Sequence, residues 1–287
     1  MKIAIASGKG GTGKTTLSTN LASYLAEKQE VVLADLDVEE PNSSFFLNTE
    51  LVCSEDKFIM TPKWDSQKCN ACGECRTNCN FNAIVSLGKE IMLFPELCHS
   101  CYACSDLCSQ NALPMIPRKM GRLTHSSLGN LSFVEGRLDI GQVQAVSLIS
   151  QTISYLDENF SKDTIIILDS PPGTSCPVME VAKNVDYIIL ISEPTPFGMS
   201  DLKLAARTMQ LLNKDFGLVI NRYENDSEEI LELCKEENIE IIAKIPNDRK
   251  IAELYSKGKL IYTEHDAFRE QLDVIYNKIL YKKGVCR

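Results

Sequence analysis

Short apolar runs alternate with segments of helical periodicity along most of the chain. Lys2–Ser7 and Val31–Leu36 are rich in aliphatic residues, which is typical of buried strands, and Lys14–Lys28 between them has apolar residues at helical spacing. Further buried strands are predicted at Thr164–Asp169, Asp186–Ser192, Phe216–Asn221 and Glu240–Ile245. Helices are predicted over residues 142–159, 199–213, 227–237, 248–257 and 265–281. This alternation predicts an α/β fold with a doubly wound, mostly parallel sheet.

Polar residues stand at the ends of three of these predicted strands. Right-handed crossovers between parallel strands bring Ser7, Asp35 and Asp169 to one edge of the sheet. Open α/β sheets bind their ligands along this edge. We therefore expect the functional site of the α/β domain at the carboxyl ends of these strands.

A cysteine-rich segment interrupts the α/β pattern. It begins near Pro62, ends near Arg118 and contains eight of the twelve cysteines. Its two halves align at an offset of 29 residues, the separation of Cys69 and Cys98, which suggests a pseudo-two-fold repeat. We predict one α/β domain in two parts, residues 1–60 and 119–287, with residues 61–118 inserted between them. Several glycines over residues 119–141 indicate a hairpin and a loop.

Composition narrows the classes of function. A net charge of −9 and a pI near 5.0 argue against nucleic-acid binding, which needs a basic surface. No run of about 18 apolar residues occurs, so no membrane-spanning helix is expected. The chain opens on a predicted strand and lacks the layout of a signal peptide, which points to a cytoplasmic protein.

The first predicted strand and helix are joined by a glycine-rich loop, Gly8-Lys9-Gly10-Gly11-Thr12-Gly13-Lys14-Thr15. Strand, loop and helix together are the context of a P-loop, whose backbone N–H groups and helix N-terminus bind phosphate. Lys14 is predicted to contact the β- and γ-phosphates, Thr15 to bind Mg²⁺, and Thr16 offers the next hydroxyl. A glycine-rich turn without a ligand is the alternative.

Acidic residues after two strands complete the predicted nucleotide site. Asp169 has the character of a Walker B carboxylate close to Mg²⁺. Asp35 and Asp37 follow the second strand, and one of them, with preference for Asp37, is predicted to orient the attacking water. A solvated loop is the alternative interpretation of this pair.

Eight cysteines form two copies of the pattern C-x₂-C-x₂-C-x₃-C, which is typical of 4Fe–4S clusters in bacterial-type ferredoxins. In two-cluster ferredoxins the fourth cysteine of each run ligates the other cluster. The predicted ligand sets are Cys69, Cys72, Cys75 and Cys108 for one cluster, and Cys98, Cys101, Cys104 and Cys79 for the other. Zinc sites and disulfides are the alternatives for this many cysteines. Cys53, Cys234 and Cys286 have no partner at ligand spacing, and Cys234 is expected in the core.

Several segments resemble the MinD/ParA/Mrp and nitrogenase-iron-protein group of P-loop ATPases. Residues 8–16 match its deviant Walker A motif, Leu33-Ala34-Asp35-Leu36-Asp37 resembles its first switch region, and residues 167–173 resemble its second. The resemblance implies that Lys9 reaches the phosphates of a partner subunit and that Asp37 is the hydrolytic residue. Asn221, with Arg222 beside it, and Pro246 match segments that surround the adenine. The nearest subgroup carries an inserted two-cluster ferredoxin domain.

Two departures from the family pattern concern the cysteines. Asn80 and Ser109 follow the fourth cysteines, where the ferredoxin run has proline. Cys176 follows the second switch region. In the nitrogenase iron protein a cysteine of the corresponding region helps to bridge a cluster between subunits, together with a second cysteine that has no convincing counterpart here. Simple packing is therefore the preferred interpretation of Cys176, and a cluster role is the alternative that the resemblance offers.

The resemblance implies ATP or ADP, Mg²⁺ and two 4Fe–4S clusters as cofactors. It implies an ATP-dependent homodimer, or pairing with a paralogous ATPase, together with an unidentified redox or iron–sulfur partner protein. The preferred function is ATP hydrolysis coupled through dimer switching to electron transfer. The alternatives are an iron–sulfur carrier or scaffold of Mrp type and, third, a MinD-like positioning ATPase that docks on membranes through residues 265–281.

Overall fold

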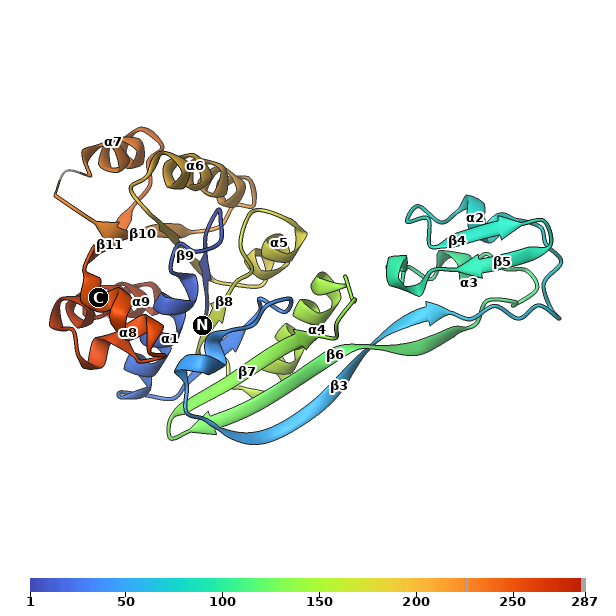
Figure 1. Cartoon of the computed structure of the whole chain (residues 1–287), viewed down its shortest axis with the longest axis horizontal. Helices are drawn as coiled ribbons and strands as arrows, with labels where there is room; N and C mark the ends of the chain where they lie inside the picture. Colours follow the sequence, from blue (N-terminus) through green and yellow to red (C-terminus); the bar gives the residue numbers. More distant parts are fainter. Residues whose placement is uncertain (226, 285–287) are drawn as a thin grey trace.

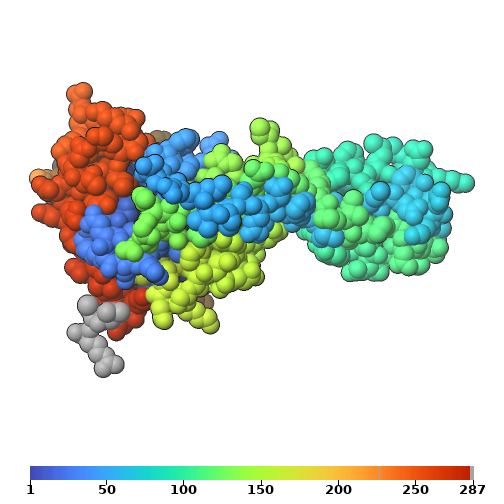
Figure 2. Space-filling model, turned by 90° about the horizontal axis from the view of Figure 1, so that it is seen from below, coloured from blue at the N-terminus to red at the C-terminus, as the bar shows by residue number. Residues whose placement is uncertain are grey.

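The computed structural model describes residues 1–225 and 227–284. A large body and a small lobe are joined by a long two-stranded arm (Figure 1). The space-filling view shows the lobe projecting from the body, with the arm running over the surface between them (Figure 2). The lobe comprises residues 63–114, which lie between the two arm strands in the chain.

Within the described residues, nine strands form one sheet in the order β11-β10-β9-β1-β8-β2-β7-β6-β3. The neighbouring strands from β11 to β7 are parallel. These strands are β1 (Lys2–Ala6), β2 (Val31–Asp35), β7 (Leu131–Leu138), β8 (Ile165–Asp169), β9 (Tyr187–Ser192), β10 (Phe216–Tyr223) and β11 (Ile241–Pro246). The antiparallel strands β6 (Met115–Leu128) and β3 (Glu50–Pro62) extend the sheet at one edge and form the arm. The predicted mostly parallel sheet is confirmed.

Helices cover both faces of the sheet. One face carries α4 (Ala145–Asn159), α5 (Cys176–Lys183), α6 (Pro196–Leu211) and α7 (Glu228–Glu236), and the other carries α1 (Lys14–Ala26), α8 (Arg249–Ser256) and α9 (Asp266–Lys283). Short 3₁₀ turns occur at η1 (Ser43–Phe46) and η3 (Ile261–Thr263). The predicted helix at residues 199–213 begins earlier, because Thr195 caps α6 by accepting a hydrogen bond from Gly198 and proline occupies its first turn.

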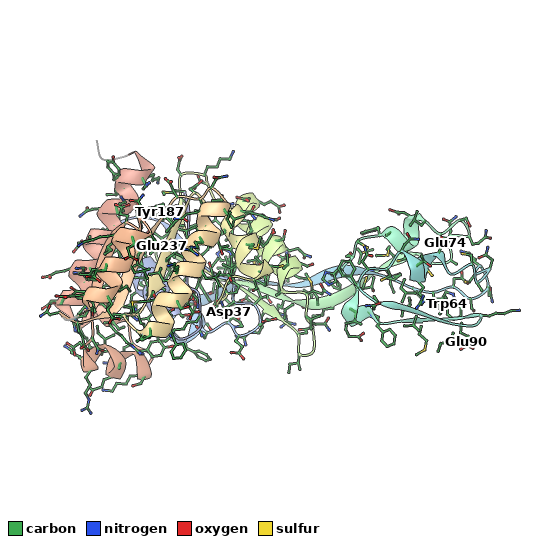
Figure 3. The ribbon with its side chains drawn as sticks, turned by 90° about the horizontal axis from the view of Figure 1, so that it is seen from above. Asp37, Trp64, Glu74, Glu90, Tyr187 and Glu237 are labelled. Carbon is green, nitrogen blue, oxygen red and sulfur yellow. The ribbon has the colours of Figure 1, made fainter. Side chains whose placement is uncertain are left out.

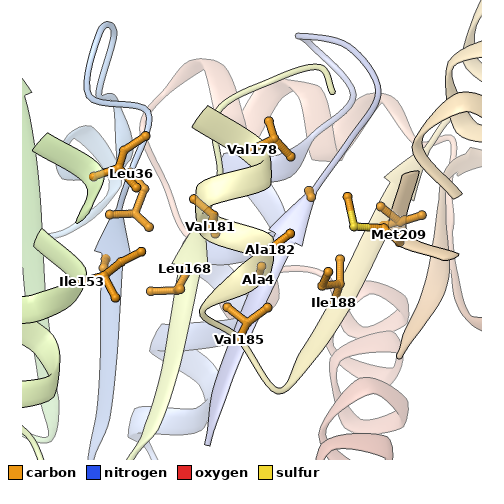
Figure 4. Packing of buried hydrophobic residues seen from close by; sticks show 14 of the residues in the cluster. Ala4, Leu36, Ile153, Leu168, Val178, Val181, Ala182, Val185, Ile188 and Met209 are labelled. Atoms are coloured by element: carbon orange, nitrogen blue, oxygen red, sulfur yellow. The ribbon is translucent and has the colours of Figure 1, made fainter. Parts of the chain in front are cut away.

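Aliphatic side chains fill the layer between the sheet and α4 and α5. Ile153 of α4 and Val178 of α5 pack against sheet residues such as Leu168 and Ile188 (Figure 4). Full burial of each such side chain contributes about 1.5–3 kcal/mol. The packing of α4 and α5 holds the strands of the sheet in place, and with them the carboxyl ends of these strands.

The arm is the largest element that the hydrophobic pattern does not predict. Seven of the thirteen residues of β3 are exposed and the buried ones, such as Ile59 and Thr61, are confined to its last part, so no continuous alternation of apolar and polar residues marks the strand in the sequence. The predicted hairpin over residues 119–141 is present as β6 and β7, but β7 also joins the parallel sheet beside β2. The predicted domain limits at residues 60–61 and 118–119 fall inside the arm strands.

The lobe has only a small core of its own. It contains α2 (Glu74–Thr77), α3 (Ala103–Asp106), a 3₁₀ turn η2 (Pro95–Leu97) and the hairpin of β4 (Ile84–Leu87) and β5 (Glu90–Leu93). Its fully packed apolar residues are Ile84, Ile91, Leu113 and Cys104, with Trp64 half-buried against them. Trp64, Glu74 and Glu90 mark the lobe in Figure 3, far from Asp37 in the body.

The C-terminal helix α9 uses its apolar face inside the body. Phe268, Leu272, Ile275 and Ile279 are buried in the core on the α1 face of the sheet. This is the packed arrangement rather than the membrane-docking one that we considered for residues 265–281. Among the described helices, none combines the length and apolar character needed to cross a bilayer.

We expect Ile153→Ala to lower the free energy of unfolding of the body by about 2–5 kcal/mol, because it leaves a cavity under α4. Ile153 is 3% exposed. Ile140 is fully exposed in the loop before α4, so Ile140→Ala is a matched control expected to change stability by less than about 0.5 kcal/mol. Denaturant unfolding followed by far-ultraviolet circular dichroism measures both. Equal losses in the two variants would contradict the packing described here.

Candidate functional site

The loop between β1 and α1 is held in shape by hydrogen bonds of its own side chains. Ser7 at its start is buried and its Oγ donates to the carbonyl oxygen of Lys9, 2.6 Å away. The Nζ of Lys14, the first residue of α1, donates to the same Oγ at 3.1 Å. Gly11 and Gly13 have positive φ angles of 76° and 102°, which favour glycine. Burial lowers the pKa of Lys14.

Close packing behind the loop explains two more features of the motif. A Cβ on Gly13 would lie 2.5 Å from Nδ2 of Asn221, and that Nδ2 donates to the carbonyl oxygen of Thr12 at 2.8 Å. A Cβ on Gly8 would lie 2.5 Å from the backbone oxygen of Asp201 in α6. The loop is therefore held between β10 and α6, which leaves its other side open.

A cavity of about 460 Å³ opens at the carboxyl ends of the parallel strands, within the usual size of ligand pockets. Ten of the predicted site residues line it: Gly10, Gly11, Gly13, Lys14, Thr15, Thr16, Asp37, Asn221, Arg222 and Pro246. Four others do not: Gly8, Lys9, Thr12 and Asp169. Thr12 and Asp169 are buried behind the cavity wall.

The cavity has further lining residues besides those named as site residues, although Pro172, Asn247 and Asp248 stand in segments that the family resemblance had indicated. Glu40, Asn42 and Pro172 come from the segments after β2 and β8, and Asn247, Asp248, Ile251, Ala252 and Tyr255 come from the β11–α8 corner. Asp248 caps α8 by accepting from the N–H of Lys250 at 2.8 Å. The helical spacing of residues 251, 252 and 255 places them on one face of α8, but this spacing alone does not indicate that the face lines a cavity.

Asp35 and Asp37 have different environments. Asp35 is fully buried, and its carboxylate accepts from the backbone N–H groups of Asp37, Asn42 and Ser43 at 3.1, 3.0 and 2.9 Å. It therefore fixes the path of the segment 37–43. Asp37 instead faces the cavity, and burial, followed by the charge of Asp35, raises its pKa to about 6.

Asp169 lies beside Asp35, since the two are paired in the register of β2 and β8. Its side chain is 1% exposed, and Oδ2 accepts from the hydroxyl of Ser43 at 3.3 Å. Oδ1 is buried without a hydrogen-bond partner among the described residues. Burial, followed by the charge of Asp35, raises the pKa of Asp169 to about 7, while Lys14 opposes the rise.

Asn221 and Arg222, near the end of β10, form one side of the cavity. Arg222 has a left-handed backbone with a φ of 53°, and its N–H donates to Oδ1 of Asn221 at 3.0 Å. Its guanidinium is 3.2 Å from the carboxylate of Glu193, which is buried at the end of β9. The ion pair orients an otherwise exposed arginine at the mouth of the cavity.

In the lobe, the cysteines of the two runs line two separate hollows. The first is lined by Cys69, Cys72, Cys75 and Cys108, and the second by Cys79, Cys98, Cys101 and Cys104. Each hollow therefore takes three cysteines from one run and the fourth from the other. Trp64 adjoins the first hollow, and the stacked rings of Phe81 and His99, 3.9 Å apart, adjoin the second.

The backbone repeats the two-fold pattern of the sequence. Positive φ angles occur at three pairs of positions separated by 29 residues: Ala71 and Ser100, Gly73 and Tyr102, and Asn82 and Asn111. The N–H groups of Ala71 and Ser100 donate to Sγ of Cys69 and Cys98 at 3.4 and 3.5 Å. Left-handed conformations are strained for alanine, serine and tyrosine, so both loops are held in an unfavourable shape.

The eleven described cysteines are free thiols. Burial, followed by neighbouring thiols, raises the pKa of Cys104 to about 11 and also raises that of Cys98. Among the described residues, no three His, Cys, Asp or Glu side chains are gathered closely enough to hold a single metal ion.

The remaining cysteines are placed apart from these hollows. Cys176 is exposed at the first position of α5, Cys234 is buried in the core as predicted, and Cys53 lies 3.4 Å from the hydroxyl of Tyr155. Cys286 lies outside the described residues.

Comparison with known proteins places this site in a family. Residues 3–261 match the family described as the CobQ/CobB/MinD/ParA nucleotide binding domain. An uncharacterized protein of Methanocaldococcus jannaschii is 30% identical over 287 residues, which cover 98% of each chain. A protein of Pyrococcus abyssi named iron–sulfur cluster carrier protein is 23% identical over 309 residues, covering 99% of this chain and 88% of its own.

Solved structures show the same fold at lower identity. The septum site-determining protein MinD of Pyrococcus horikoshii, complexed with Mg-ADP, is 18% identical and has a TM-score of 0.59 over 95% of this chain and 93% of its own. The family match spans all the residues that line the cavity. The chain therefore belongs to the CobQ/CobB/MinD/ParA family of nucleotide-binding domains.

Proposed function

We propose that this chain is an ATP-hydrolysing iron–sulfur protein, with Mg-ATP bound in the body and two 4Fe–4S clusters in a ferredoxin-like lobe. The lining of the two hollows carries the proposal. Each holds three cysteines of one run and the fourth of the other, which is the ligand exchange found in two-cluster ferredoxins. Nucleotide binding and hydrolysis would then control electron transfer through the lobe.

The chemistry of the two hollows suits the proposed clusters. Buried thiols such as Cys104 resist ionisation by themselves, and the positive charge of iron supplies the compensation that thiolates need. N–H groups aimed at the sulfur atoms of Cys69 and Cys98 stabilise the ligated, anionic form. The small apolar core of the lobe leaves ligation as the main source of its stability.

The buried carboxylate at the nucleotide cavity suits Mg²⁺. Oδ1 of Asp169 has no hydrogen-bond partner among the described residues, and Thr15 lines the cavity in front of it. These two residues would hold the ion, which neutralises charge on the phosphates. Lys14 would contact the β- and γ-phosphates in place of Ser7, and Asp37 at the cavity wall would orient the attacking water.

Lys9 supports an ATP-dependent dimer. It belongs to the phosphate loop, yet it does not line the cavity of its own chain. We propose that its side chain binds the phosphates of a second subunit, either another copy of this chain or a paralogous ATPase. ATP would favour the closed dimer to the extent that it binds that state more tightly.

An iron–sulfur carrier is the second candidate, because two relatives from Pyrococcus species are named iron–sulfur cluster carrier proteins. Four cysteines around each hollow favour firmly bound clusters and so favour electron transfer. Incubation of the cluster-loaded protein with an apo-acceptor protein distinguishes the two candidate functions. Stoichiometric transfer of iron and sulfide would favour the carrier, and retention would favour electron transfer to a redox partner protein.

We expect Lys14→Ala to lower ATP turnover on the order of 10²–10³-fold, because it removes a preorganised charge from the phosphates, while iron and sulfide contents stay unchanged.

Lys9→Ala should retain nucleotide binding but lose both dimer formation with a non-hydrolysable ATP analogue and hydrolysis. Lys162→Ala, on the exposed surface of the body, is the control for lost charge. A dimeric, active Lys9→Ala variant would rule out the proposed role of that lysine.

Removal of iron should unfold the lobe while the body stays folded. Trp64 is the single tryptophan and lies in the lobe, so its fluorescence reports on the lobe alone. We expect an anaerobic chelator to shift its emission to longer wavelengths, with little change in the thermal transition of the body followed by circular dichroism. Analysis of bound metal distinguishes iron and sulfide from zinc. An unchanged emission maximum after complete iron loss would show that ligation does not hold the lobe together.

Asp169→Asn should stabilise the nucleotide-free, Mg²⁺-free protein at pH 8. The folded-state pKa of about 7 lies above the ordinary value of 3.8, so stability falls as pH rises between these values and the buried charge is unfavourable above them. The neutral amide should gain on the order of 1–3 kcal/mol. The gain should shrink at pH 5, where the wild-type carboxyl is protonated. Thermal unfolding measures this, with exposed Asp163→Asn as the control, and a pH-independent difference would contradict it.

A further inference from the structure

Helix α4 contacts the arm and the lobe along one face. Gln144 at its N-cap, Gln151 and Tyr155 follow each other at a spacing of seven and four residues, which places them on the same side of the helix. The Nε2 of Gln151 donates to the carbonyl oxygen of Phe58 in β3 at 2.9 Å. The hydroxyl of Tyr155 lies 3.0 Å from Nδ1 of His125 in β6. The opposite face of α4 is packed into the body.

Gln144 makes the contact nearest the proposed clusters. Its side chain is 5% exposed, and Nε2 donates to the carbonyl oxygens of Cys98 and Glu96 at 2.9 and 3.2 Å. Cys98 belongs to the second hollow. Among residues 1–225 and 227–284, these are the side-chain hydrogen bonds that connect the body to lobe residues 63–114. The four cysteines of the first hollow have no corresponding connection within that part of the chain.

The start of α4 is also connected to the nucleotide cavity, through β7 and the segment 37–43. The segment 37–43, which begins at the cavity residue Asp37, docks on the end of β7. The N–H of Leu138 donates to the carbonyl oxygen of Val38 at 2.8 Å, and Arg137 donates to that of Pro41 at 3.3 Å. Residues 139–143 alone separate β7 from Gln144.

Close packing connects the same elements through the core. A Cβ on Gly136 of β7 would lie 2.8 Å from Oγ1 of Thr152 in α4 and 3.1 Å from Cγ1 of Val38. A shift of Val38 therefore has no free space to absorb it before β7 and α4 move. Hydrogen bonds and packing thus form a continuous physical connection between Asp37 and Cys98.

We propose that Gln144 is a positioning residue for the second cluster, the one assigned to Cys79, Cys98, Cys101 and Cys104, and that it transmits the nucleotide state of the segment 37–43 to that cluster. The inference rests on the proposed function. The two clusters should therefore respond differently to nucleotide. Nucleotide changes the reduction equilibrium of the second cluster, whereas the first cluster is insensitive to nucleotide because its cysteines lack a contact of this kind with the described part of the body.

The test is an anaerobic redox titration of the cluster-loaded, full-length protein, followed by electron paramagnetic resonance without nucleotide, with Mg-ADP and with a non-hydrolysable ATP analogue. Cys72→Ser and Cys101→Ser assign the signals to the first and second cluster. We expect nucleotide to change the reduction equilibrium constant of the second cluster on the order of tenfold, which is about 59 mV for one electron. Gln144→Leu should abolish this change and keep both clusters and nucleotide affinity.

Gln151→Leu is the matched control, because it removes the same kind of hydrogen bond from the same face of α4 but from the arm rather than the lobe. It should retain the nucleotide-dependent change. Gln144→Asn, which keeps the amide but shortens its reach by one methylene group, should behave as Gln144→Leu. Hydrogen exchange of the peptide containing residues 96–101 gives a second readout, and its dependence on nucleotide should disappear in both Gln144 variants.

Three results would overturn the inference: a change that persists in the Gln144 variants, a change lost equally in Gln151→Leu, or a wild-type protein whose second cluster ignores bound nucleotide. Iron, sulfide and nucleotide binding are measured first on the same preparation. A protein that lacks clusters or nucleotide binding would refute the proposed function itself, and that failure is therefore distinct from the loss of coupling.

Discussion

The pairing of β2 with β8 places two carboxylates side by side where no water reaches them. Asp35 and Asp169 are both fully or almost fully buried, and such proximity is unfavourable for two charges unless other groups compensate. Asp35 is compensated by three backbone N–H groups, and this fixes the segment 37–43. Asp169 keeps one oxygen without a partner among the described residues. The folded state thus holds a local electrostatic cost that a cation would relieve.

The lobe depends on a comparable constraint. Its cysteines converge in two groups of four, while its backbone adopts left-handed conformations at Ala71, Ser100 and Tyr102 and its apolar core is small. The left-handed backbone and the small apolar core both disfavour folding of the lobe in the absence of a ligand. Both the body and the lobe therefore carry unfavourable local arrangements whose natural compensation is a bound group. Such arrangements are characteristic of functional sites.

Much of the body could be predicted from the sequence, because its strands are buried on both faces and appear as continuous apolar runs. The phosphate loop was predictable because backbone geometry dictates glycine at Gly11 and Gly13. The cavity wall formed by Ile251 and Tyr255 could not be found in this way, because helix periodicity does not tell which exposed positions face a ligand. The ligand exchange between the two cysteine runs was inferred from the pattern of two-cluster ferredoxins and stays a prediction, and each hollow is lined by one of the two predicted groups of four cysteines. The contact of Gln144 with Cys98 joins residues distant in sequence and leaves no pattern.

The arm has a consequence for the behaviour of the protein in concentrated solution. Strand β3 is the last strand of the sheet, and its outer edge offers unpaired backbone groups to any other strand. Glu55, Asp56 and Lys57 stand consecutively on this strand, and Lys119 and Arg122 of β6 form ion pairs with Asp56. Charge at this position discourages one molecule from adding its sheet to that of the next. These charges therefore reduce the tendency of the exposed ribbon that carries the lobe to pair with a second molecule.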